Sequence, residues 1–546
     1  MKRPLTILLI TLLTILVIYA CGSTIRTANT SFVTITFGED AHTARLKAEK
    51  ATVLARARYL LADLKLMPEA YAYIPSVVQV LVVTVSAADM TTPIVGIAGI
   101  STNQTTAILR IEVPNGTARQ FTVEGIRGVD SQTYYRGTAT TDLSGVDVDL
   151  PISMALVGPG LYVNFATGTD LPATSGTSTN PFQTITYALT RTTGTDAIFV
   201  EAGTYPPAGA AAGETYPLQL HPSTALICTG AGFSTVLDLQ TLSTTAIYGN
   251  DRASMDNCMI RVNNPGGGGI AINDAIGGLP GQQSRFRING SSVELSGFPT
   301  GLANIGVIFN DDSVLLETAV IGSAAGGSVT GVQVNSGKPS IIGNAISNLP
   351  LGVELASGAG DAVISGNTFD SDNIAVRTAS AGKPQISANT FLQQFIWNGT
   401  GIAVLSGNPA ITGNTILDHS WGITVADASP DITGNTISGN WIGIDISTAV
   451  GSPRVNGNTL YCNAAHDVGV NDPQATLVFD LRNNSWDHDT TTALYPGPTV
   501  FGGPFSSLQG DDIFVTTPTP TPQYIPFNAA VPNGCLPPQG VGKPQI

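Results

Sequence analysis

Residues 409–416 read Pro-Ala-Ile-Thr-Gly-Asn-Thr-Ile, and residues 430–437 read Pro-Asp-Ile-Thr-Gly-Asn-Thr-Ile. The pattern recurs at spacings of 23, 22, 25, 21 and 23 residues around six asparagines: Asn344, Asn367, Asn389, Asn414, Asn435 and Asn458. A unit of this length is too small to bury its own apolar face, so successive units must stack. The repeat therefore predicts an all-β chain whose main body is a right-handed parallel β-helix.

The repeated asparagine has a physical role in such a stack. Asparagine tolerates the left-handed backbone conformation of a tight turn. Identical side chains on successive coils can also hydrogen-bond to one another, so we expect the six to form a ladder. A leucine-rich or propeller array does not fit, because the leucine-rich consensus is absent and propeller repeats are about twice as long.

The composition agrees with short strands and turns. Charged residues make up 12% of the chain and glycine occurs 60 times, which disfavours amphipathic helices. The net charge of -15 repels nucleic acid and anionic lipid, and no basic run is present. We therefore expect no nucleic-acid partner.

The first 20 residues have the pattern of an export signal. A basic start is followed by one apolar stretch that is short for a membrane span, which needs about 20 residues. Ile18-Tyr19-Ala20-Cys21-Gly22 resembles the lipobox of bacterial lipoproteins. The resemblance implies lipidation at Cys21 and a cell-envelope protein anchored to the outer membrane or cell surface. We expect residues 21–30 to form a linker. An uncleaved anchor and ordinary signal cleavage are the alternatives.

Four further cysteines follow in the chain: Cys228, Cys258, Cys462 and Cys535. In an oxidising compartment they allow three ways of forming two disulfides. We favour Cys228–Cys258 and Cys462–Cys535, because those partners are near in the chain. Four free buried thiols are the alternative.

Residues 31–157 differ from the repeats. Alternating apolar segments such as 78–90 and 107–116 follow one another at strand-and-turn spacing, which is typical of an antiparallel sandwich. The segment 41–66 holds a mildly helical run. The pattern resembles the Ig-like or prealbumin-like spacer modules of bacterial surface proteins, which implies a spacer or binding role. No catalytic constellation is evident there.

The start of the rod carries a second resemblance. Gly168-Thr169-Asp170, the run from Pro181 to Ile185, and Gly203-Thr204-Tyr205 resemble the opening of the pectin-lyase-like β-helices of the domain-of-unknown-function 1565 family. We expect the rod over 160–515, with at most about 15 coils. A helix starting at Asn180-Pro181 and running through Thr190 would plug the first coil. Residues 516–546 form a Pro/Thr-rich tail.

The resemblance implies an association with carbohydrate, because β-helices of this kind include pectate and pectin lyases, polygalacturonases and epimerases. Neither the calcium-and-base set of the lyases nor the aspartate set of the polygalacturonases is recognisable. We therefore expect a rod that binds polysaccharide or cell-surface glycan, or that acts as an adhesive surface. A polysaccharide lyase or glycosidase, and a purely structural spacer, are the alternatives.

Three tryptophans suggest where a glycan would bind. Trp397, Trp421 and Trp441 follow their ladder asparagines by 8, 7 and 6 residues, so they fall in consecutive coils. A row of exposed aromatic rings suits the apolar faces of sugar rings. Asp418 and His419 would supply hydrogen bonds or an acid/base pair. The alternative is that the tryptophans cover the hydrophobic stack.

No cofactor is expected, and no metal ligands are assigned. His466-Asp467 and residues 487–489 lie one coil apart, which fits either a divalent metal or a satisfied terminal turn. The acidic pairs Asp311-Asp312 and Asp511-Asp512 leave calcium open.

Overall fold

The computed structural model forms two compact units. It describes residues 29–37, 74–101, 104, 107–150, 152, 154–174, 176–193, 196–206, 213–239, 245–263, 269–274, 285–296, 303–323, 328–394, 398–447, 451–471, 481, 484–486, 500–502 and 511–515. The first unit comprises residues 29–37, 78–100 and 107–158 of these, and the second comprises the rest. The described residues include no helix long and apolar enough to cross a membrane.

The first unit is a small β domain of two sheets. One sheet has the order β4 (Ala107–Pro114), β1 (Thr30–Phe37), β7 (Val148–Asp149). The other has the order β3 (Ile94–Gly99), β2 (Val80–Ser86), β5 (Gly116–Ile126), β6 (Thr133–Leu143), β8 (Ala155–Leu156). Burial alternates along β2, with Leu81, Val83 and Val85 facing the core. This alternation is what the sequence predicted for the domain.

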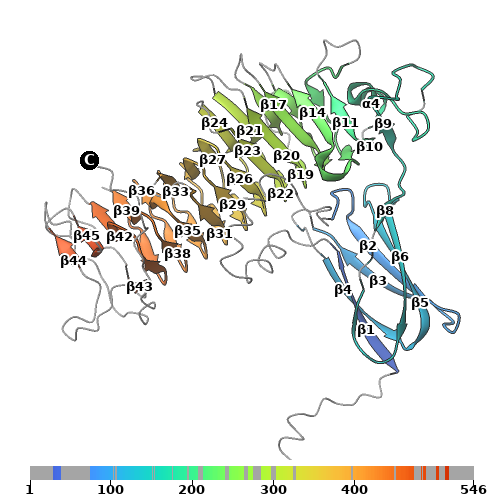
Figure 1. Ribbon diagram of the computed structural model, residues 1–546, viewed down its shortest axis with the longest axis horizontal. Helices are drawn as coiled ribbons and strands as arrows, with labels where there is room; N and C mark the ends of the chain where they lie inside the picture. The colour runs from blue at the N-terminus through green and yellow to red at the C-terminus, as the bar shows by residue number, and fades with distance from the viewer. Residues whose placement is uncertain are drawn as a thin grey trace, which may run out of the picture. The chain divides into compact units, whose positions relative to one another are not determined.

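The second unit is the rod, built from three long parallel sheets of 12, 12 and 13 strands (Figure 1). The first sheet contains β9 (Leu161–Val163), β10 (Ala197–Val200), β13 (Ala225–Cys228), β16 (Ser254–Asp256), β19 (Arg287–Asn289), β22 (Val314–Leu316), β25 (Ser340–Ile342), β28 (Val363–Ser365), β31 (Gln385–Ser387), β34 (Ala410–Thr412), β37 (Asp431–Thr433) and β40 (Arg454–Asn456).

The second sheet contains β11 (Gly203–Tyr205), β14 (Thr235–Leu239), β17 (Met259–Asn263), β20 (Ser292–Ser296), β23 (Ala319–Gly322), β26 (Ala345–Ser347), β29 (Thr368–Asp370), β32 (Thr390–Leu392), β35 (Thr415–Leu417), β38 (Thr436–Ser438), β41 (Thr459–Tyr461) and β43 (Ser485–Trp486).

The third sheet contains β12 (Leu218–Gln219), β15 (Thr245–Tyr248), β18 (Ile270–Asn273), β21 (Ala303–Phe309), β24 (Ser328–Val334), β27 (Leu351–Leu355), β30 (Ile374–Thr378), β33 (Asn398–Val404), β36 (His419–Val425), β39 (Ile442–Ser447), β42 (His466–Asn471), β45 (Asp511–Val515) and β44 (Val500–Gly502). Each coil gives one strand to each sheet, so the predicted right-handed parallel β-helix is confirmed.

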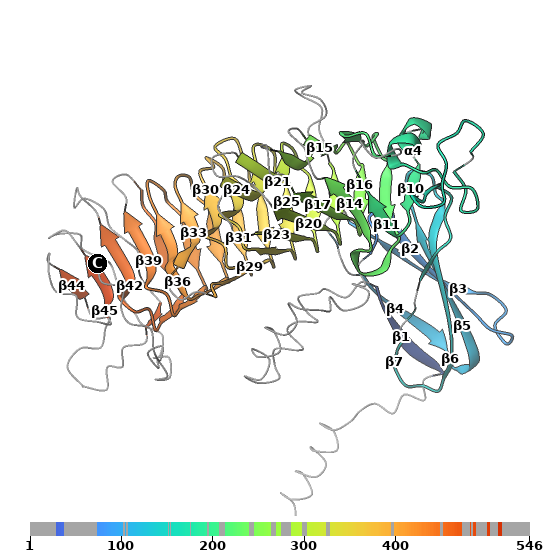
Figure 2. The same ribbon diagram turned by 45° about the horizontal axis from the view of Figure 1, so that its top comes forward.

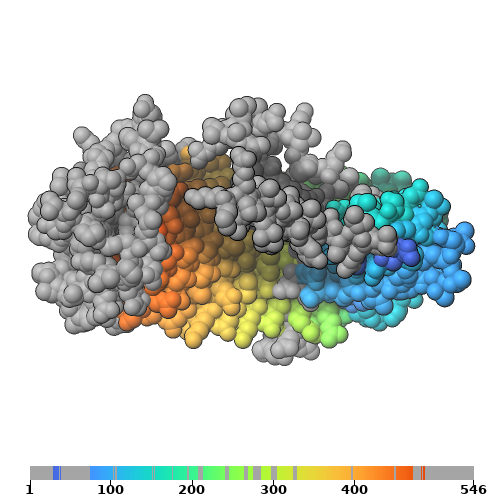
Figure 3. Space-filling view, turned by 90° about the horizontal axis from the view of Figure 1, so that it is seen from below, coloured from blue at the N-terminus to red at the C-terminus, as the bar shows by residue number. Residues whose placement is uncertain are grey.

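The coils are stacked in register around an apolar interior. Ile386, Ile411 and Ile432 pair directly across consecutive strands, and each is 0% exposed. The rings of Phe369 and Phe391 stack with centroids 4.8 Å apart. Figure 3 shows the surface of these coils as successive bands from green to orange. Over its described residues the rod has fewer coils than the 15 allowed, because paired strands before residue 340 lie further apart in the chain than the asparagine repeat.

The asparagine ladder is present as predicted. The Asn414 side-chain amide donates to Asn435 Oδ1 at 2.9 Å and to the Ile386 carbonyl at 2.8 Å. Its own Oδ1 accepts from the Asn389 backbone and side-chain amides at 2.9 and 3.0 Å. The other members bond in the same way, and Asn484 extends the ladder beyond Asn458.

Helix α4 (Ile185–Arg191) lies at the first coils of the rod (Figure 2). It starts later than the predicted Asn180-Pro181, and its N-cap is Thr184, whose side chain accepts from the Tyr187 amide. Two carboxylates explain the shift. Asp170 accepts from the Thr184 amide, and the buried Glu214 accepts from the Ile185 amide, so the donors at this helix end are satisfied there.

Cysteine pairing in the rod follows the expectation where the structure describes it. Cys228 and Cys258 form a disulfide. Cys462 is also disulfide-bonded, whereas Cys535 lies outside the described residues.

Candidate functional site

The outer surface of the third sheet carries two rows of side chains over β30, β33, β36, β39 and β42. Strand pairing defines the first row, which consists of Ile374, Thr400, Trp421, Ile442 and His466. The second row lies three residues further along each strand and consists of Arg377, Ala403, Thr424, Asp445 and Gly469. We call these two rows together the β30–β42 face. The residues directly before the second row are 0% exposed, so the second row lies on the outer side of strands that pack against the rod core.

A glycine column lies between the two rows and fixes the backbone there. Gly422 follows Trp421, and Gly401 and Gly443 occupy the same place in the neighbouring strands. A Cβ on Gly422 would lie 2.5 Å from the Gly443 carbonyl oxygen, and one on Gly401 would lie 2.7 Å from the Gly422 carbonyl oxygen. A side chain at these positions would therefore clash with the backbone of the next strand.

Trp421 is the most prominent side chain on this face. It is 41% exposed, and among the described residues no other aromatic side chain is as open to solvent. Its register partners are Thr400 on one side and Ile442 on the other. Both partners are more buried than Trp421, so the indole is the exposed side chain of this register position.

The structure gives the predicted tryptophan row only in part. Trp441 precedes Ile442, the register partner of Trp421, so the two tryptophans are offset by one position. Trp441 is half-buried, and its backbone amide donates to the His419 carbonyl at 2.8 Å. Trp397 lies outside the described residues.

Asp418 and His419 do not form an acid/base pair on the surface. Asp418 is half-buried in a left-handed turn with φ of 66°. His419 is 1% exposed, and its backbone amide donates to Asn440 Oδ1 at 2.9 Å. Burial lowers the pKa of His419 to about 4. The expectation that His419 contacts a ligand is therefore corrected, because its ring lies inside the rod.

His419 belongs to a second polar column that the sequence prediction missed. The Asn440 side chain donates to Asn463 Oδ1 at 2.9 Å, and the Asn463 side chain donates to Asp467 Oδ1 at 2.6 Å. These asparagines follow the ladder residues Asn435 and Asn458 by five positions, and that spacing was the available signal. The column links the start of β36 to a residue that precedes β39 and to Asp467 of β42.

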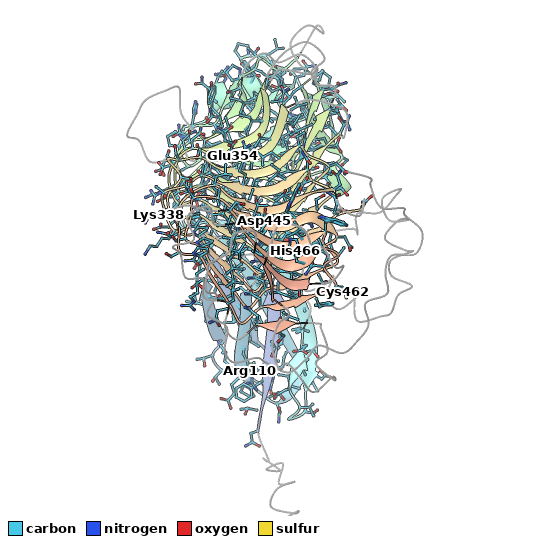
Figure 4. All side chains as sticks on the ribbon, turned by 90° about the vertical axis from the view of Figure 1, so that its left-hand side faces the viewer. Arg110, Lys338, Glu354, Asp445, Cys462 and His466 are labelled. Carbon is cyan, nitrogen blue, oxygen red and sulfur yellow. A yellow bond between two sulfur atoms is a disulfide. The ribbon has the colours of Figure 1, made fainter. Side chains whose placement is uncertain are left out.

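Asp445 and His466 lie near the same backbone position of the face. Both turn toward Gly469: a Cβ placed there would lie 3.3 Å from Asp445 Oδ1 and 3.1 Å from His466 Nε2. Figure 4 shows the two side chains close together, with Glu354 on a coil further along the rod. Burial raises the pKa of Asp445 and lowers the pKa of His466.

The sequence prediction also missed Asp445 as a surface group. The available signal was a single acidic residue at an outward position of the strand Ile-Gly-Ile-Asp-Ile-Ser.

At the other end of the face, Arg377 Nη2 lies 2.6 Å from Glu354 Oε1 on β27. That pair neutralises the one arginine of the second row.

The remaining predicted sites receive little support or lie outside the described residues. Among the described residues, no group of three His, Cys, Asp or Glu side chains could hold a metal ion. Asp312 Oδ1 accepts from the Lys338 backbone amide at 2.8 Å, which is a contact between coils. Cys21, residues 487–489 and the tail from residue 516 are outside the described residues, as are the side chains of Asp511 and Asp512.

Comparison with known proteins identifies a family for the rod. The family model described as "Protein of unknown function (DUF1565)" matches residues 166–493, which is more than half of the chain. No curated protein matches the chain.

Solved structures resemble the chain at low identity. The mannuronan C-5 epimerase AlgE6 A-module of Azotobacter vinelandii is 14% identical with a TM-score of 0.39, over 64% of this chain and 95% of that one. The catalytic unit of a GH87 alpha-1,3-glucanase of Streptomyces thermodiastaticus is 15% identical with a TM-score of 0.44, over 85% and 89%. The Dettilon tailspike protein is 12% identical with a TM-score of 0.41, over 61% and 63%. These similarities concern the fold alone.

Proposed function

The chain belongs to the DUF1565 family of proteins of unknown function, and we propose that its rod binds polysaccharide along the β30–β42 face. Because the family indicates no activity, the proposal rests on the surface of this chain. One observation carries the proposal: Trp421 is 41% exposed on β36, an interior strand of a parallel sheet. An exposed indole leaves apolar surface in contact with water. The apolar C–H face of a sugar ring can stack on the indole and remove this surface from water.

The neighbours of Trp421 favour an extended ligand. Thr424 offers a half-buried hydroxyl group in the second row, and Asp445 and His466 add polar atoms one and two coils further on. Thr424 and Asp445 are register partners in the second row, so they lie about one strand spacing, ~4.8 Å, apart across two coils. A chain of sugars can contact several of them at once, whereas a single ring cannot.

The face suits binding better than cleavage. Within the described strands β30, β33, β36, β39 and β42, Asp445 is the one carboxylate that points outward, since Asp467 is 2% exposed. Hydrolysis of glycosides generally uses two carboxyl groups across the bond that is cleaved. We therefore propose a binding surface, displayed on a cell-envelope lipoprotein whose anchor would be Cys21.

The test is a glycan array probed with the mature chain and with Trp421→Ala. We expect the substitution to weaken binding to the recognised glycan by on the order of tenfold or more, as for a central aromatic anchor. Leu405→Ala is the matched control, because Leu405 is 44% exposed but lies outside both rows. If the Trp421 variant binds every glycan as the wild type does, the proposed surface is wrong.

A further inference from the structure

The charge of the β30–β42 face narrows the class of ligand. Strands β33, β36, β39 and β42 contain no lysine or arginine. The one arginine of the second row, Arg377, is already paired with Glu354. Burial lowers the pKa of His466, which favours the neutral imidazole. Around Trp421 the face therefore offers a carboxylate and no cation to balance it.

Asp445 differs from the other outward acids of the rod in this respect. Asp431 is paired with Arg454 at 3.3 Å, Glu354 with Arg377 at 2.6 Å, and Glu294 with Arg261 at 3.3 Å. Within the described part of the chain, Asp445 has neither a hydrogen-bond partner nor an ion pair, although it is partly withdrawn from water. A partly desolvated carboxylate without a partner is unfavourable, and a cation brought by a ligand would relieve that cost.

The position of Asp445 relative to Trp421 fits one ligand that contacts both. Asp445 pairs with Thr424, which is three residues beyond Trp421 on the neighbouring strand. One strand spacing across and three residues along correspond to a separation of about 11 Å between the two backbone positions. An oligosaccharide can bridge this distance with one ring on the indole and a substituent of another ring at the carboxylate.

We propose that the β30–β42 face selects glycans that carry free amino groups, with Trp421 contacting a sugar ring and Asp445 binding the ammonium of a nearby sugar. The proposal rests on the proposed function and specifies its ligand. Uronate-bearing glycans are disfavoured, because their carboxylates would approach Asp445 with no cation on these strands to compensate. Neutral glycans retain the ring contact but lack the charge pair.

The test compares the affinities of three hexasaccharides by calorimetry at about 0.15 M salt, where long-range charge effects are screened. They are a glucosamine hexamer, an N-acetylglucosamine hexamer and a galacturonate hexamer. For the wild type we expect the glucosamine hexamer to bind about five- to tenfold more tightly than the N-acetylated one. Asp445→Asn should bring that ratio close to one and leave the affinity for the N-acetylated hexamer nearly unchanged.

The control is Asp149→Asn, which removes the same charge from an exposed position of the first unit and should keep the wild-type ratio. The proposal is overturned if Asp445→Asn keeps the wild-type ratio, if the wild type prefers the galacturonate hexamer, or if it does not bind the glucosamine hexamer. Trp421→Ala separates the two claims. If that variant loses binding while Asp445→Asn keeps the ratio, the amino-sugar inference alone fails. If Trp421→Ala changes nothing, the proposed function fails as well.

Discussion

Replacing Asn414 with alanine should destabilise the rod strongly. Asn414 stands inside the asparagine ladder, is 1% exposed, and takes part in four hydrogen bonds through its side chain. It accepts two from Asn389 and donates one each to Ile386 and Asn435. Alanine can make none of these, and the turn is too enclosed for bulk water to replace them.

The expected loss of unfolding free energy follows from the hydrogen-bonding groups that the substitution leaves without a partner. Each hydrogen bond contributes a net ~1 kcal/mol, and a buried group that loses its partner costs ~1–3 kcal/mol. The backbone amide of Asn389 loses its acceptor, and the carbonyl of Ile386 loses the side-chain donor. Some of these groups retain a second partner, so we expect Asn414→Ala to lower the free energy of unfolding of the rod by about 3–5 kcal/mol.

Urea unfolding, monitored by circular dichroism, measures the decrease in unfolding free energy. Hydrogen exchange shows which backbone amides lose protection. The Asn389 amide should exchange much faster in the variant than in the wild type. Asn408→Ala is the control, because Asn408 is exposed on a turn of the same coil, and it should change stability by less than about 0.5 kcal/mol. If the two substitutions prove equally mild, the ladder does not stabilise the fold as argued.

Two further predictions concern pH and export. Because burial lowers the pKa of His419 from 6.5 to about 4, its contribution to stability is fully present above pH 6.5 and is lost as pH falls toward 4. His419→Gln should therefore remove up to about 3 kcal/mol of the acid-side dependence of unfolding free energy, and an unchanged pH profile would refute this. Cys21→Ser should abolish incorporation of labelled palmitate in a bacterial host, and labelling that persists would rule out Cys21 as the anchor.

The rod was predictable from sequence because its repeat is enforced by packing. The turn at each ladder asparagine and the apolar residue two positions later recur in every coil from Asn344 to Asn458, so the pattern is visible without a structure. The start of α4 was not predictable from sequence, because the backbone amides at its N-terminus donate to Asp170 and Glu214. These two residues lie 14 residues before and 30 residues after the N-cap Thr184. Tertiary contacts of that kind leave no local signal.

The candidate site was only partly predictable for a related reason. Trp421 was identified because tryptophan is rare in this chain, which has four. Whether a residue near Trp421 faces solvent or the core depends on the strand register, and a register shift of one position moves its side chain to the opposite face. His419 therefore turned inward although it lies two residues from Trp421, and Asp445 reached the face although it is a full coil away in sequence.

The central claim is that a sugar ring sits on Trp421. A variant in which Trp397, Trp441 and Trp486 are replaced by phenylalanine leaves Trp421 as the single fluorescent indole. Titration with the glycan that the array identifies should shift its emission to shorter wavelength and saturate at the affinity measured by calorimetry, because the ring then leaves water. An unchanged emission spectrum while calorimetry records binding would contradict the account.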